Sequence, residues 1–201
     1  YTDIVLAANT LNTFFDHLAQ NNWVLLPFDL KMASQLLDSA TQKQKSGLFR
    51  EARLAKSETH QPKIRGDSTL WLDEKDLSLS NSELAALHFL ENLKENLRQY
   101  FRISISTFEC HYACYSVGSF YQKHTDSSFG ENPRLFSFVI YLNSDWSNND
   151  GGALKAYNTE NLELFSIVPK AGQMILFRSD LLHEVLPTQK TRYSLTGWFR
   201  R

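Results

Sequence analysis

Residues 105–117, ISTFECHYACYSV, begin the part of the chain that decides its fold, because short strand-like runs follow from here to the C-terminus. Aromatic residues are frequent in these runs, and they fit pleated β surfaces. Turn signals such as NNDGG and PKAGQ separate them. The remaining seven runs are 119–125, 134–143, 152–158, 162–169, 172–179, 182–187 and 192–201. Eight short strands in about 100 residues predict a β-sandwich or a jelly-roll barrel.

The first hundred residues have a different, mainly helical pattern. Apolar residues recur at helical spacing in 9–22, 29–44 and 80–101, and Ser80 or Ser82 is a plausible N-cap of the third helix. WVLLP, residues 23–27, is a short buried strand ended by Pro27. Together with the strands downstream, this pattern predicts an α+β protein.

A polar and basic segment, residues 47–76, separates the second and third helices. Its ends, GLFREARL and STLWL, look like strands, and we expect an exposed finger over residues 47–67. A loop of this length in a compact domain is either disordered or functional. The length of 201 residues predicts one domain, with 1–102 as helical support plus the finger and 103–201 as the barrel core.

Composition excludes several classes of function. The formal net charge is −1, so no overall field attracts nucleic acid or anionic membrane. The longest apolar run, FSFVIYL, is too short to span a bilayer.

No signal peptide is visible, and a start at Tyr1 indicates a trimmed chain. Cys110 and Cys114 lie too far apart on one strand for a disulfide, so we expect free thiols and a cytoplasmic location.

The chain has six histidines, and four of them point to no particular chemistry. His17 and His88 fall within helices and His60 within the finger, where surface positions are the simplest interpretation. His111 falls within a strand and could line a cavity, but nothing pairs with it locally.

His124 and Asp126 differ, because residues i and i+2 of a strand project from the same face. An HxD pair alone is weak evidence of a metal site. His183 strengthens it, because two histidines and one carboxylate form the facial triad of Fe(II) oxygenases, which leaves three coordination positions open.

Arg192 follows His183 by nine residues, in the run RYSLTGWFRR. A guanidinium matches a carboxylate through two parallel hydrogen bonds, as the tail of an iron-chelating 2-oxoglutarate would require. On a strand, Arg192 shares a face with Ser194, Thr196 and Trp198, so Ser194 could donate to the same carboxylate. By itself, a solvent-facing arginine would explain the run equally well.

The segments ACYSVGSFYQKHTD, FVIYLNSDW, DGGALKAY and RSDLLHEVLPTQKTRYSLTGW resemble the Fe(II)/2-oxoglutarate-dependent prolyl 4-hydroxylase superfamily. GLFREARL followed by KIRGDSTLW resembles the hypoxia-inducible-factor type of protein prolyl hydroxylase and its bacterial relatives. The resemblance runs from about residue 12 to the end, and it implies a double-stranded β-helix, a jelly-roll or cupin-like barrel flanked by N-terminal helices.

The resemblance also implies roles for individual residues. The resemblance implies that iron is held by His124, Asp126 and His183. It also implies that 2-oxoglutarate is bound by Arg192, Tyr141, Tyr115 and Ser194, and that Thr196 lies near the metal-bound water. Ser194 stands where the animal enzymes carry alanine, and the segment between Tyr115 and His124 is one residue shorter, so details of this contact and turn differ. The implied substrate groove contains Arg65, Asp67, Arg134 and Trp198. Alternatively, Arg65 and Asp67 simply tie the base of the finger together, and Trp198 belongs to the core.

The function implied is hydroxylation of a prolyl residue in a protein substrate, using Fe(II), 2-oxoglutarate and O2, with ascorbate as a further candidate cofactor and succinate and CO2 as products. Bacterial relatives of this branch act on elongation factor Tu, which makes a translation factor a candidate substrate. Two alternatives stay open: the same chemistry on a free amino acid or other small molecule, and a non-catalytic binding module. A monomer that binds neither nucleic acid nor membrane is expected.

Overall fold

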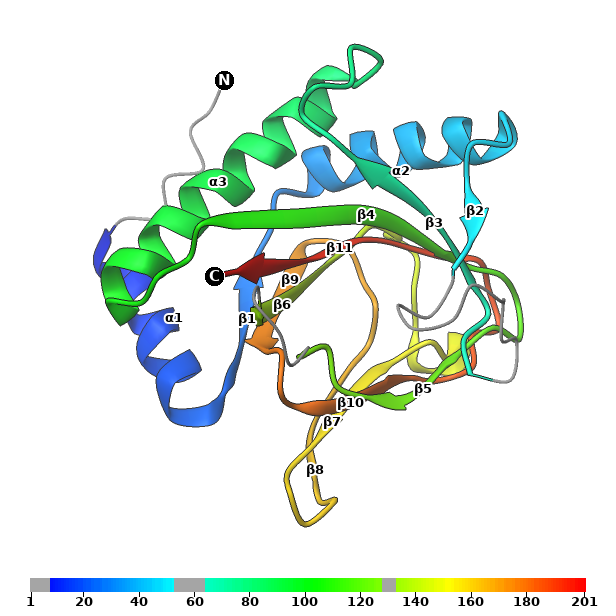
Figure 1. Cartoon of the computed structure of the whole chain (residues 1–201). Helices are drawn as coiled ribbons and strands as arrows, with labels where there is room; N and C mark the ends of the chain where they lie inside the picture. Colours follow the sequence, from blue (N-terminus) through cyan, green and yellow to red (C-terminus); the bar gives the residue numbers. More distant parts are fainter. Residues whose placement is uncertain (1–7, 53–63, 128–132) are drawn as a thin grey trace.

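The computed structural model describes residues 8–52, 64–127 and 133–201 (Figure 1). The three predicted helices are confirmed as α1 (Ala8–Asn21), α2 (Leu30–Lys45) and α3 (Asn81–Phe101). Helix α3 begins with a capping box, in which Ser80 accepts from the Glu83 amide and the Glu83 side chain accepts from the Ser80 amide. Ser80 is therefore the N-cap, and Ser82 lies inside the helix.

The strands form two antiparallel sheets. The larger sheet has the order β1-β9-β6-β11-β4-β3-β2, and the smaller has the order β5-β10-β7-β8. Their bounds are β1 (Trp23–Pro27), β2 (Arg50–Glu51), β3 (Asp67–Leu72), β4 (Thr107–Tyr115), β5 (Tyr121–His124), β6 (Arg134–Tyr141), β7 (Leu154–Tyr157), β8 (Glu163–Ile167), β9 (Gln173–Arg178), β10 (Leu182–Val185) and β11 (Arg192–Arg200). All eight strands predicted after residue 103 are confirmed, whereas the strand predicted at the start of the finger is only two residues long.

The large sheet has other elements packed on both of its faces, although β2 and Trp71 of β3 near one edge are exposed. On one face it packs against the three helices through a cluster that includes Phe15, Leu90 and Leu195. On the other face it packs against the small sheet, where Ile175 and Phe177 of β9 meet Phe165 of β8. Figure 1 shows this order of layers, with the helices and the small sheet on opposite sides of the large sheet.

Strand β11 lies near the centre of the large sheet, paired with β4 on one side and β6 on the other. Its side chains alternate as the period of a strand requires. Tyr193, Leu195 and Phe199 join the helix-side core. The four residues that we expected to share a face, Arg192, Ser194, Thr196 and Trp198, all line one cavity between the sheets.

Several further predictions can be placed on the fold. Cys110 and Cys114 are buried free cysteines on β4, as expected. The middle of the predicted finger, 53–63, lies outside the described residues, and so does His60. Among the helices of the described ranges, none is long and apolar enough to cross a membrane.

Gly197 marks the tightest approach in the large sheet. A Cβ atom placed there would lie 2.1 Å from the Glu109 carbonyl oxygen and 2.7 Å from Cζ of Phe138. Both neighbours are held in strands paired with β11, so neither can withdraw without disturbing the sheet. The position therefore requires glycine.

Gly197→Ala is expected to lower the free energy of unfolding by about 3 kcal/mol or more, through overpacking of the sheet. Gly47→Ala is the matched control, because Gly47 has a positive φ of 71° but a Cβ atom placed there would meet nothing within 4 Å. That variant should lose only about 1 kcal/mol, from backbone strain. Urea unfolding of both variants tests this, and equal losses would contradict it.

Candidate active site

A cavity of about 1330 Å³ opens between the two sheets. Eleven of the twelve predicted site residues line it: Arg65, Asp67, Tyr115, His124, Asp126, Arg134, His183, Arg192, Ser194, Thr196 and Trp198. Tyr141, the twelfth, is fully buried behind the wall, where its ring centroid lies 5.5 Å from Cζ of Arg192. The fold thus brings together residues that are up to 133 positions apart in the sequence (65 to 198).

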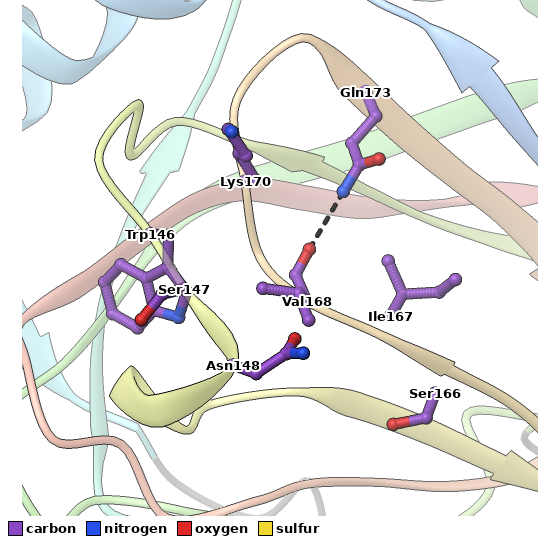
Figure 2. A pocket seen from close by; sticks show the side chains of 8 residues that line it. All are labelled: Trp146, Ser147, Asn148, Ser166, Ile167, Val168, Lys170 and Gln173. Carbon is purple, nitrogen blue, oxygen red and sulfur yellow. Dashed lines mark hydrogen bonds between the residues drawn. The ribbon is translucent and has the colours of Figure 1, made fainter.

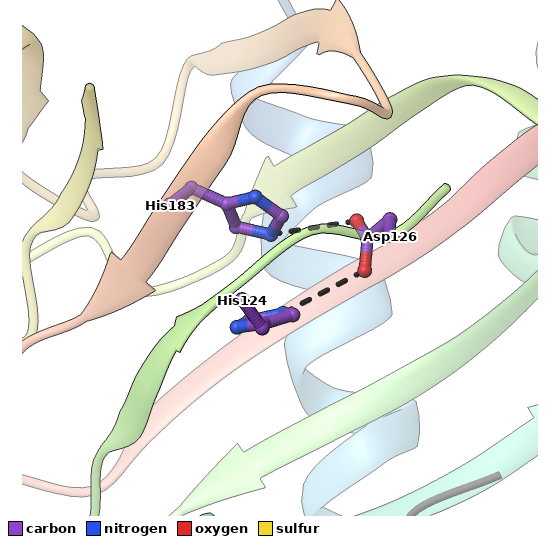
Figure 3. Close-up of side chains that lie close together, drawn as sticks. All are labelled: His124, Asp126 and His183. Carbon is purple, nitrogen blue, oxygen red and sulfur yellow. Dashed lines mark ion pairs between the residues drawn. The ribbon is translucent and has the colours of Figure 1, made fainter. Parts of the chain in front are cut away.

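His124, Asp126 and His183 converge in this cavity (Figure 3). His183 on β10 is paired directly with His124, the last residue of β5. The Nε2 atom of His124 lies 3.6 Å from Oδ1 of Asp126, and that of His183 lies 3.4 Å from Oδ2. One ligand atom from each of the three lies within 4.8 Å of the others, so the group could hold a metal ion.

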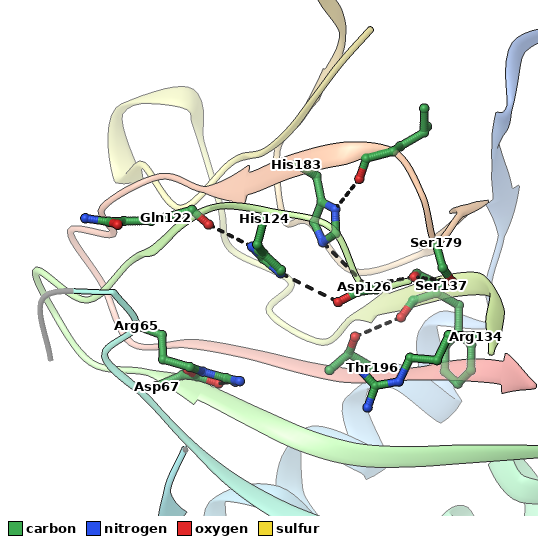
Figure 4. A network of polar contacts seen from close by, with 12 residues as sticks. Arg65, Asp67, Gln122, His124, Asp126, Arg134, Ser137, Ser179, His183 and Thr196 are labelled. Carbon is green, nitrogen blue, oxygen red and sulfur yellow. Dashed lines mark hydrogen bonds and ion pairs between the residues drawn. The ribbon is translucent and has the colours of Figure 1, made fainter. Parts of the chain in front are cut away.

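Both imidazoles are oriented by hydrogen bonds on the side away from Asp126 (Figure 4). Nδ1 of His124 lies 2.7 Å from the Gln122 carbonyl oxygen, and Nδ1 of His183 lies 2.9 Å from the Leu181 carbonyl oxygen. Because a carbonyl only accepts, each Nδ1 carries the proton and donates it. Each Nε2 faces the Asp126 carboxylate, which raises the pKa of His183, and it can bind a metal once any proton that it shares with this carboxylate is released.

Asp126 reaches the site differently from the way the sequence predicted. Strand β5 ends at His124, so Asp126 does not share a strand face with it. Instead, the Asp126 amide donates to the Ser179 carbonyl at 2.9 Å. Ser137 then donates to Oδ2 of Asp126 at 2.7 Å, and its hydroxyl also lies 2.9 Å from that of Ser179.

These two serines, both buried, are site residues that sequence reasoning missed. Ser137 lies outside the segments that carry the resemblance, and Ser179, although it lies in one of them, was given no role there. The pairing of β6 with β9 places Ser137 near Ser179, the residue after β9. Burial alone would raise the pKa of Asp126, but the neighbouring imidazoles of His183 and His124 hold it well below its usual value. The carboxylate is therefore ionised, as a metal ligand must be.

Arg192 is 1% exposed, and no salt bridge to it is found in the described parts of the chain. Its Nη1 donates to Ser194 at 3.3 Å, and its Cζ lies 5.0 Å from the ring centroid of Tyr115. Its Nε and the Tyr141 hydroxyl are both buried, and within the described ranges neither atom has a hydrogen-bond partner at normal geometry. A buried cation without a counter-charge is costly, so this end of the cavity is suited to an anion.

The predicted groove residues are held in two separate pairs. Arg65 donates two hydrogen bonds to Asp67, at 2.7 and 2.6 Å, and its Cζ lies 4.4 Å above the ring of Tyr121. Arg134 lies 3.5 Å above the ring of Trp198 and donates to Glu109, a residue that sequence reasoning missed. Arg65 and Asp67 are therefore tied to each other at the base of the finger, while Trp198 lines the cavity.

His111 extends the aromatic wall beyond Trp198. Its ring centroid lies 5.4 Å from that of Trp198 and 4.6 Å from that of Trp71. Trp71 is 52% exposed, so the wall runs from the interior of the cavity to the molecular surface. The expectation that His111 could line a cavity is confirmed.

A second hollow, of about 470 Å³, lies at residues 146–148 and 166–173 (Figure 2). Its lining includes Lys170 and an amide of Gln173 that donates to the Val168 carbonyl at 2.8 Å. It contains none of the predicted site residues, and no cluster of possible metal ligands was found there among the described residues. The larger cavity is therefore the candidate active site.

Comparison with known proteins agrees with this geometry. Residues 110–200 match the family model of the 2OG-Fe(II) oxygenase superfamily. A prolyl-4-hydroxylase from Pseudomonas putida, known from its crystal structure, is 30% identical, with a TM-score of 0.86 over 95% of this chain and 99% of that chain. The chain therefore belongs to the 2OG-Fe(II) oxygenase superfamily.

Two further proteins are similar over most of this chain. Egl nine homolog 1 of Rattus norvegicus is 30% identical over 164 residues, which are 77% of this chain and 47% of that protein. The chain thus spans about half the length of this curated relative. A Trichoplax adhaerens prolyl hydroxylase, solved with a peptide of the hypoxia inducible factor oxygen degradation domain, is 24% identical, with a TM-score of 0.83 over 96% of this chain and 89% of that chain. The predicted double-stranded β-helix with N-terminal helices is confirmed.

The burial of His111 predicts a dependence of stability on pH. Burial lowers the pKa of His111 from its ordinary 6.5 to about 4. Between these two values the unfolded chain binds a proton that the folded chain does not, so stability falls as pH falls from about 6.5 towards 4. At pH 5 the loss due to His111 should be about 2 kcal/mol relative to pH 7.5.

His111→Phe should remove this part of the loss, because phenylalanine keeps an aromatic ring beside Trp71 but does not titrate. His88→Phe, at an exposed position of α3, is the control and should keep the loss. The measurement is urea unfolding at both pH values, with chelator in every sample so that the other histidines titrate alike. Parallel pH profiles for parent and His111→Phe would refute the assignment.

Proposed function

We propose that the protein is an Fe(II)- and 2-oxoglutarate-dependent dioxygenase that hydroxylates a prolyl residue of a protein substrate. The observation that carries this proposal is that one cavity holds both a His-Asp-His cluster and a buried, uncompensated arginine. The membership of the superfamily and the likeness to prolyl hydroxylases support it.

The residues present fit a divalent iron. Two imidazoles that face the cavity with Nε2 and one ionised carboxylate are the ligand types of the facial triad, which leaves positions for co-substrate and oxygen. His124, Asp126 and His183 would hold the ion. Ser137 and the Gln122 and Leu181 carbonyls would fix the orientation of these ligands.

The arginine end fits the distal carboxylate of 2-oxoglutarate. Arg192 would bind it with its guanidinium donors, and the buried Tyr141 hydroxyl, which has no partner at normal geometry among the described residues, would add one more hydrogen bond. Ser194 accepts from Arg192, so its own proton is available to the same carboxylate. Tyr115 lies beside Arg192 on the cavity wall, where its ring would exclude water from the ion pair.

When bound, iron and 2-oxoglutarate supply the oxidation of a C–H bond by O2, with release of succinate and CO2. The chain's own residues supply position and a limited access of water. Thr196 donates its proton to the Phe138 carbonyl at 2.8 Å, so its oxygen can only accept from a water near the metal. No acid or base side chain is required for this chemistry, and ascorbate would serve only to maintain reduced iron.

A polypeptide substrate is supported by the size and the lining of the cavity. Its volume of about 1330 Å³ exceeds the roughly 300–1,000 Å³ typical of small-molecule pockets, and it reaches the surface at Trp71. Arg134 and Trp198 lie along this opening and would contact the substrate chain on either side of the proline.

A bacterial-type translation factor, such as elongation factor Tu, is the substrate that we would test first. The enzyme would act as a cytoplasmic monomer.

The decisive experiment combines mass spectrometry with succinate release. The protein is incubated with Fe(II), 2-oxoglutarate and candidate substrate proteins, and prolyl residues are searched for the mass of one added oxygen atom. Prolyl oxidation matched by succinate, and absent for His183→Ala, is the expected result. Succinate released with free amino acids but not with proteins would favour the small-molecule alternative, and no succinate at all would favour a binding module.

Arg192→Ala should weaken 2-oxoglutarate binding by about 2–5 kcal/mol, which corresponds to roughly 30-fold to several-thousand-fold in affinity. Arg192→Lys should recover only part of this loss, because an ammonium cannot form two parallel hydrogen bonds. Tyr141→Phe should lose about 1 kcal/mol, the value of one neutral hydrogen bond. Isothermal titration of 2-oxoglutarate into the Mn(II)-loaded protein measures all three, and an unchanged affinity for Arg192→Ala would place the carboxylate elsewhere.

A further inference from the structure

We infer that Tyr121 is a positioning residue for His124, and that Arg65 acts on the metal centre through the ring of Tyr121 rather than by contact with substrate. This inference rests on the proposed metal site. It adds two residues to the support of that site and gives Arg65 a different role from the one expected from the sequence.

The first observation is a stack of three side chains. The rings of Tyr121 and His124 are nearly parallel, with centroids 3.6 Å apart and an angle of 18° between the planes. On the same tyrosine ring lies the guanidinium of Arg65, with Cζ 4.4 Å from the centroid. Arg65 is itself fixed by the paired hydrogen bonds to Asp67, whose side chain is fully buried.

The second observation is that the backbone joins the same two segments. The Gly66 amide donates to the Phe120 carbonyl, and the Gln122 amide donates to the Ile64 carbonyl, which together frame a bridge between Arg65 and Tyr121. The Gln122 carbonyl in turn accepts from Nδ1 of His124. The segment 64–67 therefore contacts His124 through the tyrosine ring and through the residue that orients its imidazole.

These contacts act on different degrees of freedom of the imidazole. A single hydrogen bond at Nδ1 fixes one atom of the ring but lets the plane turn about the N–O direction. The Tyr121 ring restricts that turn on one face, and the centroid of the His183 ring lies 4.2 Å away, with an angle of 53° between the planes. Since Nε2 can bind a metal only in the plane of its ring, the stack keeps Nε2 directed to the place where His124, Asp126 and His183 converge.

The test is metal affinity, with Co(II) as the probe and its visible absorption as the readout of bound imidazole. Tyr121→Leu removes the flat ring and should weaken Co(II) binding by about 10- to 100-fold, the usual cost of losing an outer-shell partner. Tyr121→Phe keeps the ring and should stay within about threefold of the parent, because it preserves the stack. Tyr100→Leu, on α3 beside Phe15, is the control for general loss of packing and should leave Co(II) affinity unchanged.

A double substitution tests the route through the ring. Arg65→Met alone should weaken Co(II) binding by a few-fold, since a cation on a ring face is a modest interaction. In the Tyr121→Leu background the same change should have no further effect, because Arg65 would have nothing left to act through. Independent, multiplying losses would overturn the assignment of Arg65.

The outcomes separate this inference from the proposed function. If Tyr121→Leu is folded and binds Co(II) within twofold of the parent, or if Tyr121→Phe is as weak as Tyr121→Leu, the positioning role is wrong while the metal site stands. If the parent binds Co(II) no better than His183→Ala does, the metal site itself is wrong, and this inference falls with it.

Discussion

The pairing of β11 with its two neighbours is the constraint on which the rest of the structure depends. Nine residues of β11 pair with β4 and seven with β6, so the register of the strand is fixed on both sides. A slip of one residue would exchange the two faces of the strand. It would turn Arg192 and Ser194 into the apolar layer under the helices, and Leu195 and Phe199 into the cavity. Because Leu195 and Phe199 must pack against the helices, the alternate residues Arg192 and Ser194 must face the cavity.

The two ends of the cavity are built by different parts of this frame. The arginine end is formed by β11, β4 and β6, all in the large sheet. The histidine end is formed by β5 and β10 of the small sheet, and Asp126 is hydrogen-bonded to Ser137 of the large sheet and to Ser179, the residue after β9. The distance between the two ends is thus set by the packing of one sheet on the other, through residues such as Phe165 and Phe177.

The sequence was sufficient to predict the helices, the positions of the strands along the chain and the meeting of His124, Asp126, His183 and Arg192. These features depend on periodicity within one element or on spacing that the superfamily shares. What it could not predict are contacts between side chains that no motif joins. Ser137 reaches Asp126, Glu109 holds Arg134, and Tyr121 lies between Arg65 and His124. Each of these depends on which strands become neighbours, and periodicity says nothing about neighbours. The interpretation of Asp126 was wrong for a related reason, since its place is set by a hydrogen bond to Ser179 rather than by the period of β5.

Under the proposed function, the buried guanidinium of Arg192 links the stability of the folded protein to the binding of its co-substrate. A cation that is 1% exposed, with no salt bridge in the described residues, makes the empty fold less stable than the same fold with a carboxylate in place. Any ligand that binds only the folded state adds to stability by mass action, in proportion to the logarithm of its concentration. The co-substrate would then act as part of the core. Resistance to proteolysis would rise and fall with the supply of 2-oxoglutarate, so the amount of enzyme as well as its rate would follow the metabolic state of the cell.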